Sequence, residues 1–182
     1  MKLLLTTSRN ASQRVRQFIK EFSHIFPKSN VQKANRGKKS LQDLFNESID
    51  KYDRILLITN KQGNPNKIIG YYKNQDKEFI WGFEFKLKYV KLSYEFDSEP
   101  LRHPKNLNLL FEEVDHELEK ALSNFFDPFL VKSTNDMAEE TLNVLFRHNE
   151  KGFELFPLGS ADERLAPEIA IREIIIEDSE VA

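Results

Sequence analysis

The first 60 residues alternate between short apolar runs of strand length and amphipathic segments of helical length. Residues 2–7 and 54–60 are apolar runs, and residues 31–36 are read as a further strand. Between these runs, apolar side chains recur every three or four positions over 15–26 and over 41–49. That spacing is typical of helices that bury one face. The order strand, helix, strand, helix, strand predicts a parallel or mostly parallel sheet with helices packed on it.

Residues that cap helices stand where both helices are predicted to begin. Asn10 or Ser12 precedes the first helix, where a side-chain oxygen accepts hydrogen bonds from the free amides of the first turn. Ser40, with Asp43 three residues later, is a variant capping box for the second helix. Pro27 is expected to end the first helix. Both helices therefore have defined starts, each directly after a strand-to-helix loop.

The second part of the chain mixes strands and helices in a similar way. GNPN at 63–66 predicts a turn that joins the third strand to the next one as a hairpin. From Phe79 the odd positions are apolar, and after Tyr89 the even positions are, which predicts a bulge or bend in one long strand. A helix is predicted over 109–126, where Asp127 and Pro128 end it. Further strands are predicted at 142–146, 153–156 and 168–177.

These elements predict an α/β fold with mixed, largely parallel sheet layers and packed helices. The length of 182 residues suits one domain or two small, closely packed halves. We expect a single domain over 1–182 that consists of a basic half, 1–78, and an acidic half, 79–182.

Composition excludes several classes of protein. The chain has no cysteine, which excludes disulfides, zinc ribbons and thiol catalysis. No apolar run approaches the ~20 residues needed to span a bilayer, and MKLLLTT is shorter than the apolar region of a signal peptide. A cytoplasmic protein without a membrane partner is therefore expected.

The net charge of −2 hides a strong division along the chain. Residues 1–40 hold ten Lys or Arg and one acid, a formal +9, so the remaining residues carry −11. Such a division creates a local positive field, which binding to a polyanion requires. The alternative explanation is a solvated face of Lys and Arg without a ligand.

The predicted sheet collects the basic residues at one edge. Loops that leave the carboxyl ends of parallel strands gather there, and three loops would do so, at 7–12, 36–40 and 60–63. The first two loops also lead into helix N-termini, which favour phosphate. The cations expected at this edge are Arg9, Arg36, Lys38, Lys39 and Lys61, with Gly37 allowing close approach of a ligand to the backbone.

Two other groups of residues have alternative interpretations. Glu112, Asp115, His116 and Glu119 fall at helical spacing and could hold a divalent metal, but the same segment is typical of a solvated helix. Trp81, Phe83 and Phe85 could stack on RNA bases, but their alternation favours a core position. No Gly-x-Ser-x-Gly, P-loop or Gly-x-Gly-x-x-Gly motif supports catalysis.

Segments of the first 72 residues resemble the Brix-domain ribosome-biogenesis family. They are TTSRNASQRVRQFIKEFSHIFP, NRGKKSLQDL and LLITNKQGNPNKIIGYY, in the order that the family has them. VLFRHN at 144–149 is similar to a Phe-Arg-His stretch in the second half of that family. The chain resembles a compact archaeal member of the branch that acts in small-subunit processing. Carried over residue by residue, the family motif falls on Thr6, Thr7, Ser8, Arg9, Ser12, Arg14, Arg36, Gly37, Gly63 and Pro65.

The resemblance implies an RNA-binding assembly factor that acts on precursor ribosomal RNA without catalysis of its own. It also implies two α/β halves that resemble the anticodon-binding domain of some aminoacyl-tRNA synthetases. The implied partners are ribosomal RNA or its precursor and other ribosome-assembly proteins, with no cofactor, metal or small-molecule substrate. From the motif and the charge pattern together, the expected RNA contacts are Thr7, Ser8, Arg9, Asn10, Ser12, Arg14, Arg36, Gly37, Lys38, Lys39 and Lys61.

Two other functions remain open at this point. A protein-interaction scaffold could dock an acidic partner through the same basic edge. A nuclease could use the acids at 112–119.

Overall fold

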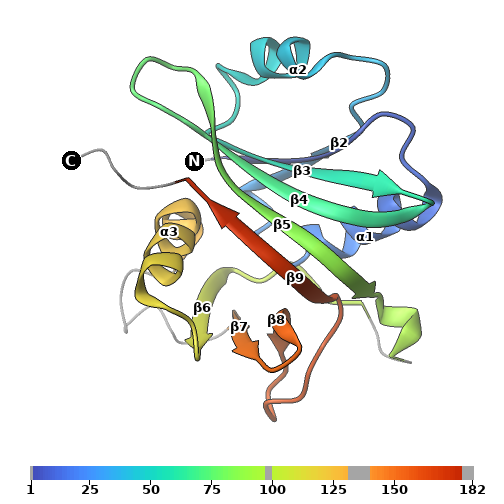
Figure 1. Ribbon diagram of the computed structural model, residues 1–182, viewed down its shortest axis with the longest axis vertical. Helices are drawn as coiled ribbons and strands as arrows, with labels where there is room; N and C mark the ends of the chain where they lie inside the picture. The colour runs from blue at the N-terminus through green and yellow to red at the C-terminus, as the bar shows by residue number, and fades with distance from the viewer. Residues whose placement is uncertain (1, 97–99, 131–139, 178–182) are drawn as a thin grey trace.

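The computed structural model describes residues 2–96, 100–130 and 140–177. Its strands join in one sheet with the order β2-β1-β3-β4-β5-β9-β8-β7-β6 (Figure 1). The described residues contain no helix that is long and apolar enough to cross a membrane.

The first half of the sheet is built around β1. Strand β1 (Leu3–Thr7) pairs in parallel with β2 (Val31–Ala34) on one side and with β3 (Arg54–Lys61) on the other. Helix α1 (Gln13–Ser23) connects β1 to β2, and α2 (Leu41–Ser48) connects β2 to β3. Antiparallel strands β4 (Asn64–Lys73) and β5 (Phe79–Lys91) then continue the sheet. The predicted alternation of strands and helices in the first 60 residues is confirmed.

The second half repeats this plan in a shorter form. Strand β6 (Asn106–Glu112) is followed by α3 (His116–Phe126) and by β7 (Thr141–Asn149), which pairs in parallel with β6. Antiparallel strands β8 (Gly152–Leu158) and β9 (Glu168–Ile176) follow. The short 3-10 helices η1 (Ser93–Glu95) and η2 (Asp127–Phe129) follow β5 and α3.

The two halves are similar in topology. Each half has a parallel pair whose strands are connected through helical segments, β1 with β3 in the first half and β6 with β7 in the second. Two antiparallel strands then extend each pair, β4 and β5 in the first half and β8 and β9 in the second. The first half contains β2 and α2 in addition. Strands β5 and β9 pair antiparallel and join the halves into one sheet. The boundary at residues 78 and 79 and the resemblance to an anticodon-binding domain stay predictions.

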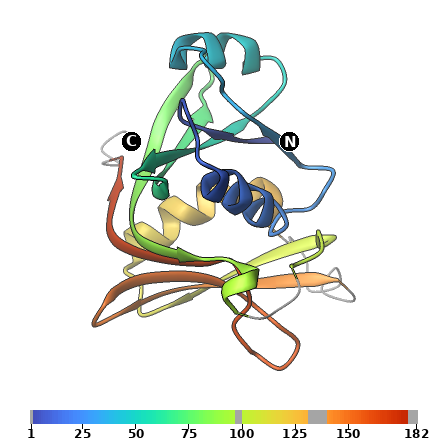
Figure 2. The same ribbon diagram turned by 90° about the vertical axis from the view of Figure 1, so that its right-hand side faces the viewer.

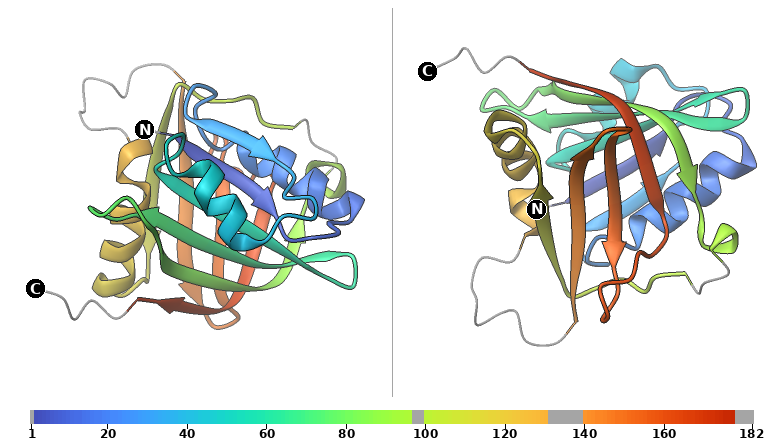
Figure 3. Two further views of the ribbon diagram at one scale, coloured as in Figure 1. Left: turned by 90° about the horizontal axis from the view of Figure 1, so that it is seen from above. Right: turned by 60° about the horizontal axis from the view of Figure 1, so that its bottom comes forward.

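The sheet curves around helices α1 and α3. Helices α1 and α3 lie between the strands of the first half and those of the second (Figure 2). Their apolar faces, which include Phe18, Phe22, Leu122 and Phe126, belong to the main core together with residues of both halves of the sheet. Helix α2 covers the opposite face of the first half (Figure 3), where Leu44 packs in a smaller cluster with residues of β1 and β3.

The mixed α/β class is confirmed, but the sheet is not largely parallel. Of the eight pairs of neighbouring strands in the described part of the chain, three are parallel. The other five pairs are antiparallel. Four of them join strands that follow one another in the chain, and the fifth joins β5 to β9. Short connections join antiparallel strands, whereas a parallel pair needs a longer crossover.

The predicted helix over 109–126 is wrong in its first part. Leu107, Leu109 and Phe111 alternate with more exposed residues and form β6, and α3 begins only at His116. The residue after this strand, Glu113, has a φ of +56°, which no helix contains. Leu110, Val114 and Leu118 satisfy a spacing of four by coincidence, because Leu110 lies on a strand. Helix α1 is also shorter than predicted, since it ends at Ser23.

Bulges in β5 divide its aromatic residues between two cores. The register against β4 shifts between Gly70 and Tyr71, opposite Gly82. As a result Phe79 packs in the α2 cluster, whereas Phe83 and Phe85 are buried in the main core. The preference for a core position over base stacking is therefore confirmed for Phe83 and Phe85. A second irregularity, against β9, spans residues 86–89, close to the predicted change of register.

Candidate nucleic-acid interface

The loop after β1 is tied directly to the end of β3. The amide of Ser8 donates to the carbonyl of Ile58 at 2.8 Å, which extends the parallel ladder by one bond. Asn60 then makes two contacts back to this loop. Its amide donates to Ser8 Oγ at 3.2 Å, and its Nδ2 donates to the carbonyl of Asn10 at 3.1 Å. Asn10 itself has a φ of +57°, a conformation that Asn adopts more readily than most residues.

Ser12 joins the start of α1 to the β3–β4 turn. Its Oγ accepts a hydrogen bond from the Val15 amide at 3.1 Å and so caps the helix. The same hydroxyl donates to the carbonyl of Gly63 at 2.6 Å. Ser12 is thus the predicted cap, and it also fixes the helix against a turn that lies 51 positions away.

The arginines of the first two loops converge on one carbonyl oxygen. Arg9 Nε donates to the Lys39 carbonyl at 3.2 Å, and Arg36 Nε donates to the same oxygen at 2.8 Å. Gly37, the residue after Arg36 in the second loop, has a φ of +63°, which glycine adopts without strain. The predicted meeting of the two loops is therefore confirmed. We define the basic edge as Arg9, Arg36, Lys38, Lys39 and Lys61.

Two acids of α2 lie beside the basic edge. Asp43 accepts hydrogen bonds from the Oγ and the amide of Ser40, and these bonds, with the nearby charges of Arg9 and Lys39, lower the pKa of the Asp43 carboxyl. Lys39 Nζ forms an ion pair with Glu47. Within the described ranges, no ion pair involves Arg9, Arg36, Lys38 or Lys61. The edge thus keeps an excess of positive charge.

The two helix N-termini at this edge differ in what they offer an anion. Helix α2 carries its own carboxylate in the capping box of Ser40 and Asp43, so its first turn already holds a negative charge. Helix α1 has no acid in its first turn. Phosphate binding at the two N-termini stays a prediction, and of the two only α1 has a first turn without a carboxylate.

Three of the expected contact residues are occupied in holding the structure together. Thr7 is 2% exposed, so it is not available to a ligand at the surface. Ser8 and Ser12 are half-buried and use their hydroxyls within the loops. Burial thus excludes Thr7 as a surface contact, and the hydroxyls of Ser8 and Ser12 hold the loops in position. Arg9, Asn10, Gly37, Lys38, Lys39 and Lys61 are exposed, and Arg36 is half-buried.

Arg14 does not join the basic edge. Its Nη2 donates to the carbonyl of Val90 at 2.8 Å and to Glu95 Oε2 at 2.9 Å, so the guanidinium lies against the end of β5 and η1. The helical spacing leaves the direction of Arg14 undetermined, because it depends on how α1 packs against β5.

Sequence reasoning missed two residues that shape the first loop. Arg16 donates from Nε and Nη2 to the carbonyl of Ala11, at 3.1 and 2.7 Å, and closes the loop from the helix side. Asn60, described above, ties the loop to β3. Asn60 could have been identified from the sequence, because it is a polar residue at the end of an apolar strand. Arg16 gave no signal that distinguished it from other helix surface cations.

The suggested metal group is not arranged as one face of a helix. Glu112 is the last residue of β6, Asp115 caps α3 by accepting from the Leu118 amide at 2.8 Å, and His116 and Glu119 lie on the helix. The helical spacing on which the group was built is therefore wrong. In the part of the chain that the structure describes, no three His, Asp or Glu side chains are placed to hold a metal ion.

Among the curated proteins that match this chain, one matches along nearly its whole length and others match over less than half of it. A probable Brix domain-containing ribosomal biogenesis protein from Methanococcus maripaludis is 25% identical over 181 residues, which cover 98% of this chain and 100% of that protein. One from Thermococcus kodakarensis is 40% identical over 67 residues, 36% of this chain and 31% of the relative. The curated homologues of this chain are Brix-domain ribosomal biogenesis proteins. No family model matches the chain.

Two solved structures share the fold of this chain. A probable ribosomal biogenesis protein from Aeropyrum pernix superposes with a TM-score of 0.73 at 23% identity and covers 94% of this chain and 96% of its own. An archaeal Imp4-like protein superposes with a TM-score of 0.64 at 19% identity, over 96% and 99% of the two chains. The predicted resemblance to the Brix-domain family is confirmed, and the assignment to a small-subunit branch stays a prediction.

Proposed function

We propose that this protein is a ribosome-assembly factor that binds ribosomal RNA or its precursor through the basic edge. The observation that carries the proposal is the convergence of Arg9 and Arg36 on the Lys39 carbonyl. Like charges repel, so two guanidinium groups gathered at one oxygen favour an anion from outside the chain. Lys38 and Lys61, which are exposed and form no ion pair with any described residue, extend the same positive surface.

A phosphate backbone fits this surface better than a set of base edges does. The cations stand at the ends of strands and in loops, and α1 offers an N-terminus without acids in its first turn. Positive side chains and helix N-termini bind phosphate oxygens, which position a nucleic acid without reading its sequence. We therefore expect modest sequence preference and recognition that depends on RNA shape.

The names of the homologues support the assembly role. Those of the Methanococcus, Thermococcus and Aeropyrum proteins describe ribosomal biogenesis proteins. We infer that the chain holds precursor ribosomal RNA in a shape suitable for processing, without catalysis, cofactor or small-molecule substrate. Other ribosome-assembly proteins are expected as partners, and we expect the protein in the cytoplasm.

Fluorescence anisotropy with a labelled fragment of ribosomal RNA tests the proposal. The logarithm of the affinity is expected to fall linearly with the logarithm of salt concentration, with a slope for ~3 to 6 phosphate contacts at about 0.7 each for single strands. An affinity that does not depend on salt, or no binding at low salt, would contradict RNA binding through the basic edge.

Competition distinguishes RNA from the alternative of an acidic protein partner. Unlabelled structured RNA is expected to displace the labelled fragment at a much lower concentration than polyglutamate of similar total charge. The reverse order would favour a scaffold that docks an acidic polypeptide. Crosslinking in cells, followed by sequencing of the bound RNA, then identifies the RNA segment.

A further inference from the structure

Two tyrosines at the end of β5 expose their rings to solvent. Tyr89 is 38% exposed and Tyr94 is 61% exposed, and the other large apolar side chains exposed in the described ranges are Leu110 and Ile175. Exposed apolar side chains that occur singly need no explanation, but two aromatic rings within six residues form a local feature. They lie at β5 and η1, on the same side of the molecule as the β3–β4 turn (Figure 1).

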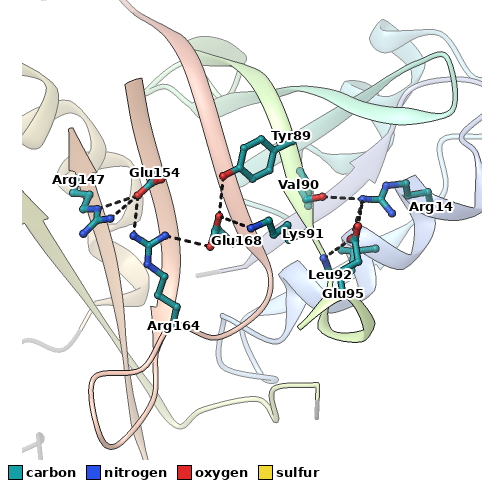
Figure 4. A network of polar contacts seen from close by, with 10 residues as sticks. All are labelled: Arg14, Tyr89, Val90, Lys91, Leu92, Glu95, Arg147, Glu154, Arg164 and Glu168. Carbon is teal, nitrogen blue, oxygen red and sulfur yellow. Dashed lines mark hydrogen bonds and ion pairs between the residues drawn. The ribbon is translucent and has the colours of Figure 1, made fainter. Parts of the chain in front are cut away.

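The ring of Tyr94 is held in place although it is exposed. Arg14 Nη1 donates to the Tyr94 hydroxyl at 2.5 Å. The same guanidinium donates to the Val90 carbonyl and pairs with Glu95 (Figure 4), and together with the bond to Tyr94 these contacts fix it at three points. Glu95 in turn accepts from the Leu92 amide at 2.8 Å. Arg14 therefore orients Tyr94, and the ring loses little freedom when a ligand covers it.

Tyr89 is oriented by a different set of contacts. Its hydroxyl donates to Glu168 Oε1 at 3.0 Å, and Glu168, which is 2% exposed, is fixed by Arg164 at 3.3 Å (Figure 4). Partial burial and the hydrogen bond to Glu168 raise the pKa of Tyr89, so its ring stays neutral. Lys91 Nζ lies 5.5 Å from the centre of the Tyr89 ring and 5.6 Å from that of Phe96.

The surroundings of the two rings suit an anionic ligand with flat groups. Lys91 and Lys88 are exposed, and Lys88 is the residue that the bulge between Leu87 and Tyr89 leaves out of the ladder. Among the described acids beside the rings, Glu95 pairs with Arg14, and Glu168 pairs with Arg164 and, at 3.8 Å, with Lys91. Arg14 also lies in the first turn of α1, two residues after Ser12, which is bonded to the β3–β4 turn. Ser12 and the β3–β4 turn thus connect the start of α1, whose Arg14 holds Tyr94, to the loops that carry the basic edge.

We propose that Tyr89 and Tyr94 form a stacking site for unpaired bases of an RNA whose backbone is held at the basic edge. Bases of single-stranded RNA stack on exposed aromatic side chains, and neighbouring cations contact the phosphates between them. Arg14 is a positioning residue in this site, because it acts through Tyr94. The inference rests on the proposed function and adds the kind of RNA that binds, which is one with an unpaired segment.

Two strands that share phosphates but differ in bases test the stacking site. One is an oligouridine strand of about twelve nucleotides and the other is an abasic strand of equal length, both measured at low salt. The wild-type protein is expected to prefer the strand with bases. Tyr94→Leu is expected to lower the affinity for oligouridine about five- to tenfold, with no change for the abasic strand, since stacking on one ring accounts for an effect of that size.

Matched variants distinguish a loss of base stacking from other causes of weaker RNA binding. Tyr94→Phe keeps the ring and is expected to retain most of the preference for bases, and Tyr89→Leu should reduce it as Tyr94→Leu does. Leu110→Ala, at a similarly exposed apolar position on β6, is expected to change neither affinity. Circular dichroism melting confirms that each variant is folded.

The outcomes distinguish failure of the stacking site from failure of the proposed function. If the wild-type protein binds both strands equally, or Tyr94→Leu binds oligouridine as the wild type does, the stacking site is overturned and RNA binding stands. If the wild-type protein binds neither strand nor structured RNA, the proposed function fails and the stacking site with it. Ultraviolet crosslinking of oligouridine to Tyr89 or Tyr94, located by mass spectrometry, would support the site independently.

Discussion

Arg9 and Arg36 donate their Nε hydrogens to the same oxygen, the carbonyl of Lys39, although they belong to different loops. The parallel pairing of β1 with β2 makes this possible, because it brings the ends of both strands to one edge of the sheet. Their shared acceptor is a backbone atom that carries no net charge, so it orients both guanidinium groups without neutralising either. The structure thus presents two fixed positive charges at the basic edge.

Charge reversal at this edge should weaken RNA binding and leave the fold intact. Arg9→Glu and Arg36→Glu each replace attraction by repulsion at the phosphate backbone, and each should reduce the salt slope by about one contact. Both guanidinium groups are at the surface, so the free energy of unfolding is expected to change by less than about 0.5 kcal/mol. Anisotropy titrations with the ribosomal RNA fragment and urea unfolding measure the two effects.

Controls for charge reversal come from the acidic half. Arg172→Glu, at an exposed position of β9, and Lys151→Glu, in the β7–β8 turn, make the same change of charge away from the basic edge. Their effect on RNA affinity should be much smaller. If all four variants are folded and weaken RNA equally, the basic edge is an ordinary solvated surface. Lys132, another lysine of the acidic half, lies outside the described residues.

Removal of the Ser12 hydroxyl should destabilise the protein. Ser12→Ala loses the helix cap to Val15 and the bond to the Gly63 carbonyl, and we expect a loss of about 1 to 2 kcal/mol in the free energy of unfolding. Ser29→Ala is the matched control, because the exposed hydroxyl of Ser29 bonds to the neighbouring Asn30 side chain. Urea denaturation of the two variants should therefore differ clearly, and equal midpoints would show that Ser12 is not a structural link.

Acid should weaken the contact between α1 and the segment before β6 through His24. His24 Nδ1 bonds to the Leu101 carbonyl, His103 Nδ1 bonds to the Phe26 carbonyl, and the ring centres lie 4.5 Å apart. Burial lowers the pKa of His24 below its ordinary 6.5, and the charges of His103, Lys33 and Lys20 lower it further, against the raising effect of the bond to Leu101. The folded state therefore binds the proton less readily than the unfolded state does.

The sign of the pH dependence follows from this lowered pKa. The contribution of neutral His24 to stability is complete above 6.5 and is lost as the pH falls below that value towards the folded-state pKa. Urea unfolding should be measured at about pH 7.5 and about pH 5.5 for the wild type and for His24→Gln. The urea midpoint should fall more between these two pH values for the wild type than for the variant. His116→Gln, at an exposed histidine of α3, should behave as the wild type does. If the urea midpoint of His24→Gln falls with pH as much as that of the wild type, the proposed role of His24 is contradicted.

Metal removal should have no specific effect on stability. Glu112, Asp115, His116 and Glu119 are divided between β6, the cap of α3 and the helix itself, and Asp115 is engaged by the Leu118 amide. Neither EDTA nor magnesium is expected to shift the melting temperature beyond ordinary ionic effects, because a specifically bound ion would stabilise the folded state by mass action. A saturable shift at micromolar metal would contradict this expectation.

Local signals in the sequence determined most elements of the first half. Ser12 and the box of Ser40 and Asp43 cap the helices as predicted, because a cap depends on residues three positions apart. The same local reasoning misplaced the start of α3. Leu110, Val114 and Leu118 are spaced four apart, as in a helix, but the chain up to Glu112 is a strand in which burial alternates with a period of two.

By itself, the sequence determined the strand-to-helix loops, their caps and the concentration of positive charge in the first 40 residues, because these depend on neighbours along the chain. Only the tertiary structure decided that Thr7 is buried and that Arg14 turns away from the basic edge to hold Tyr94. It also decided the antiparallel pairing of β5 with β9, which joins strands about 85 positions apart. The physical reason is that side-chain direction and strand partnership depend on which surfaces pack together, and a periodic pattern shows that a face is buried without showing against what.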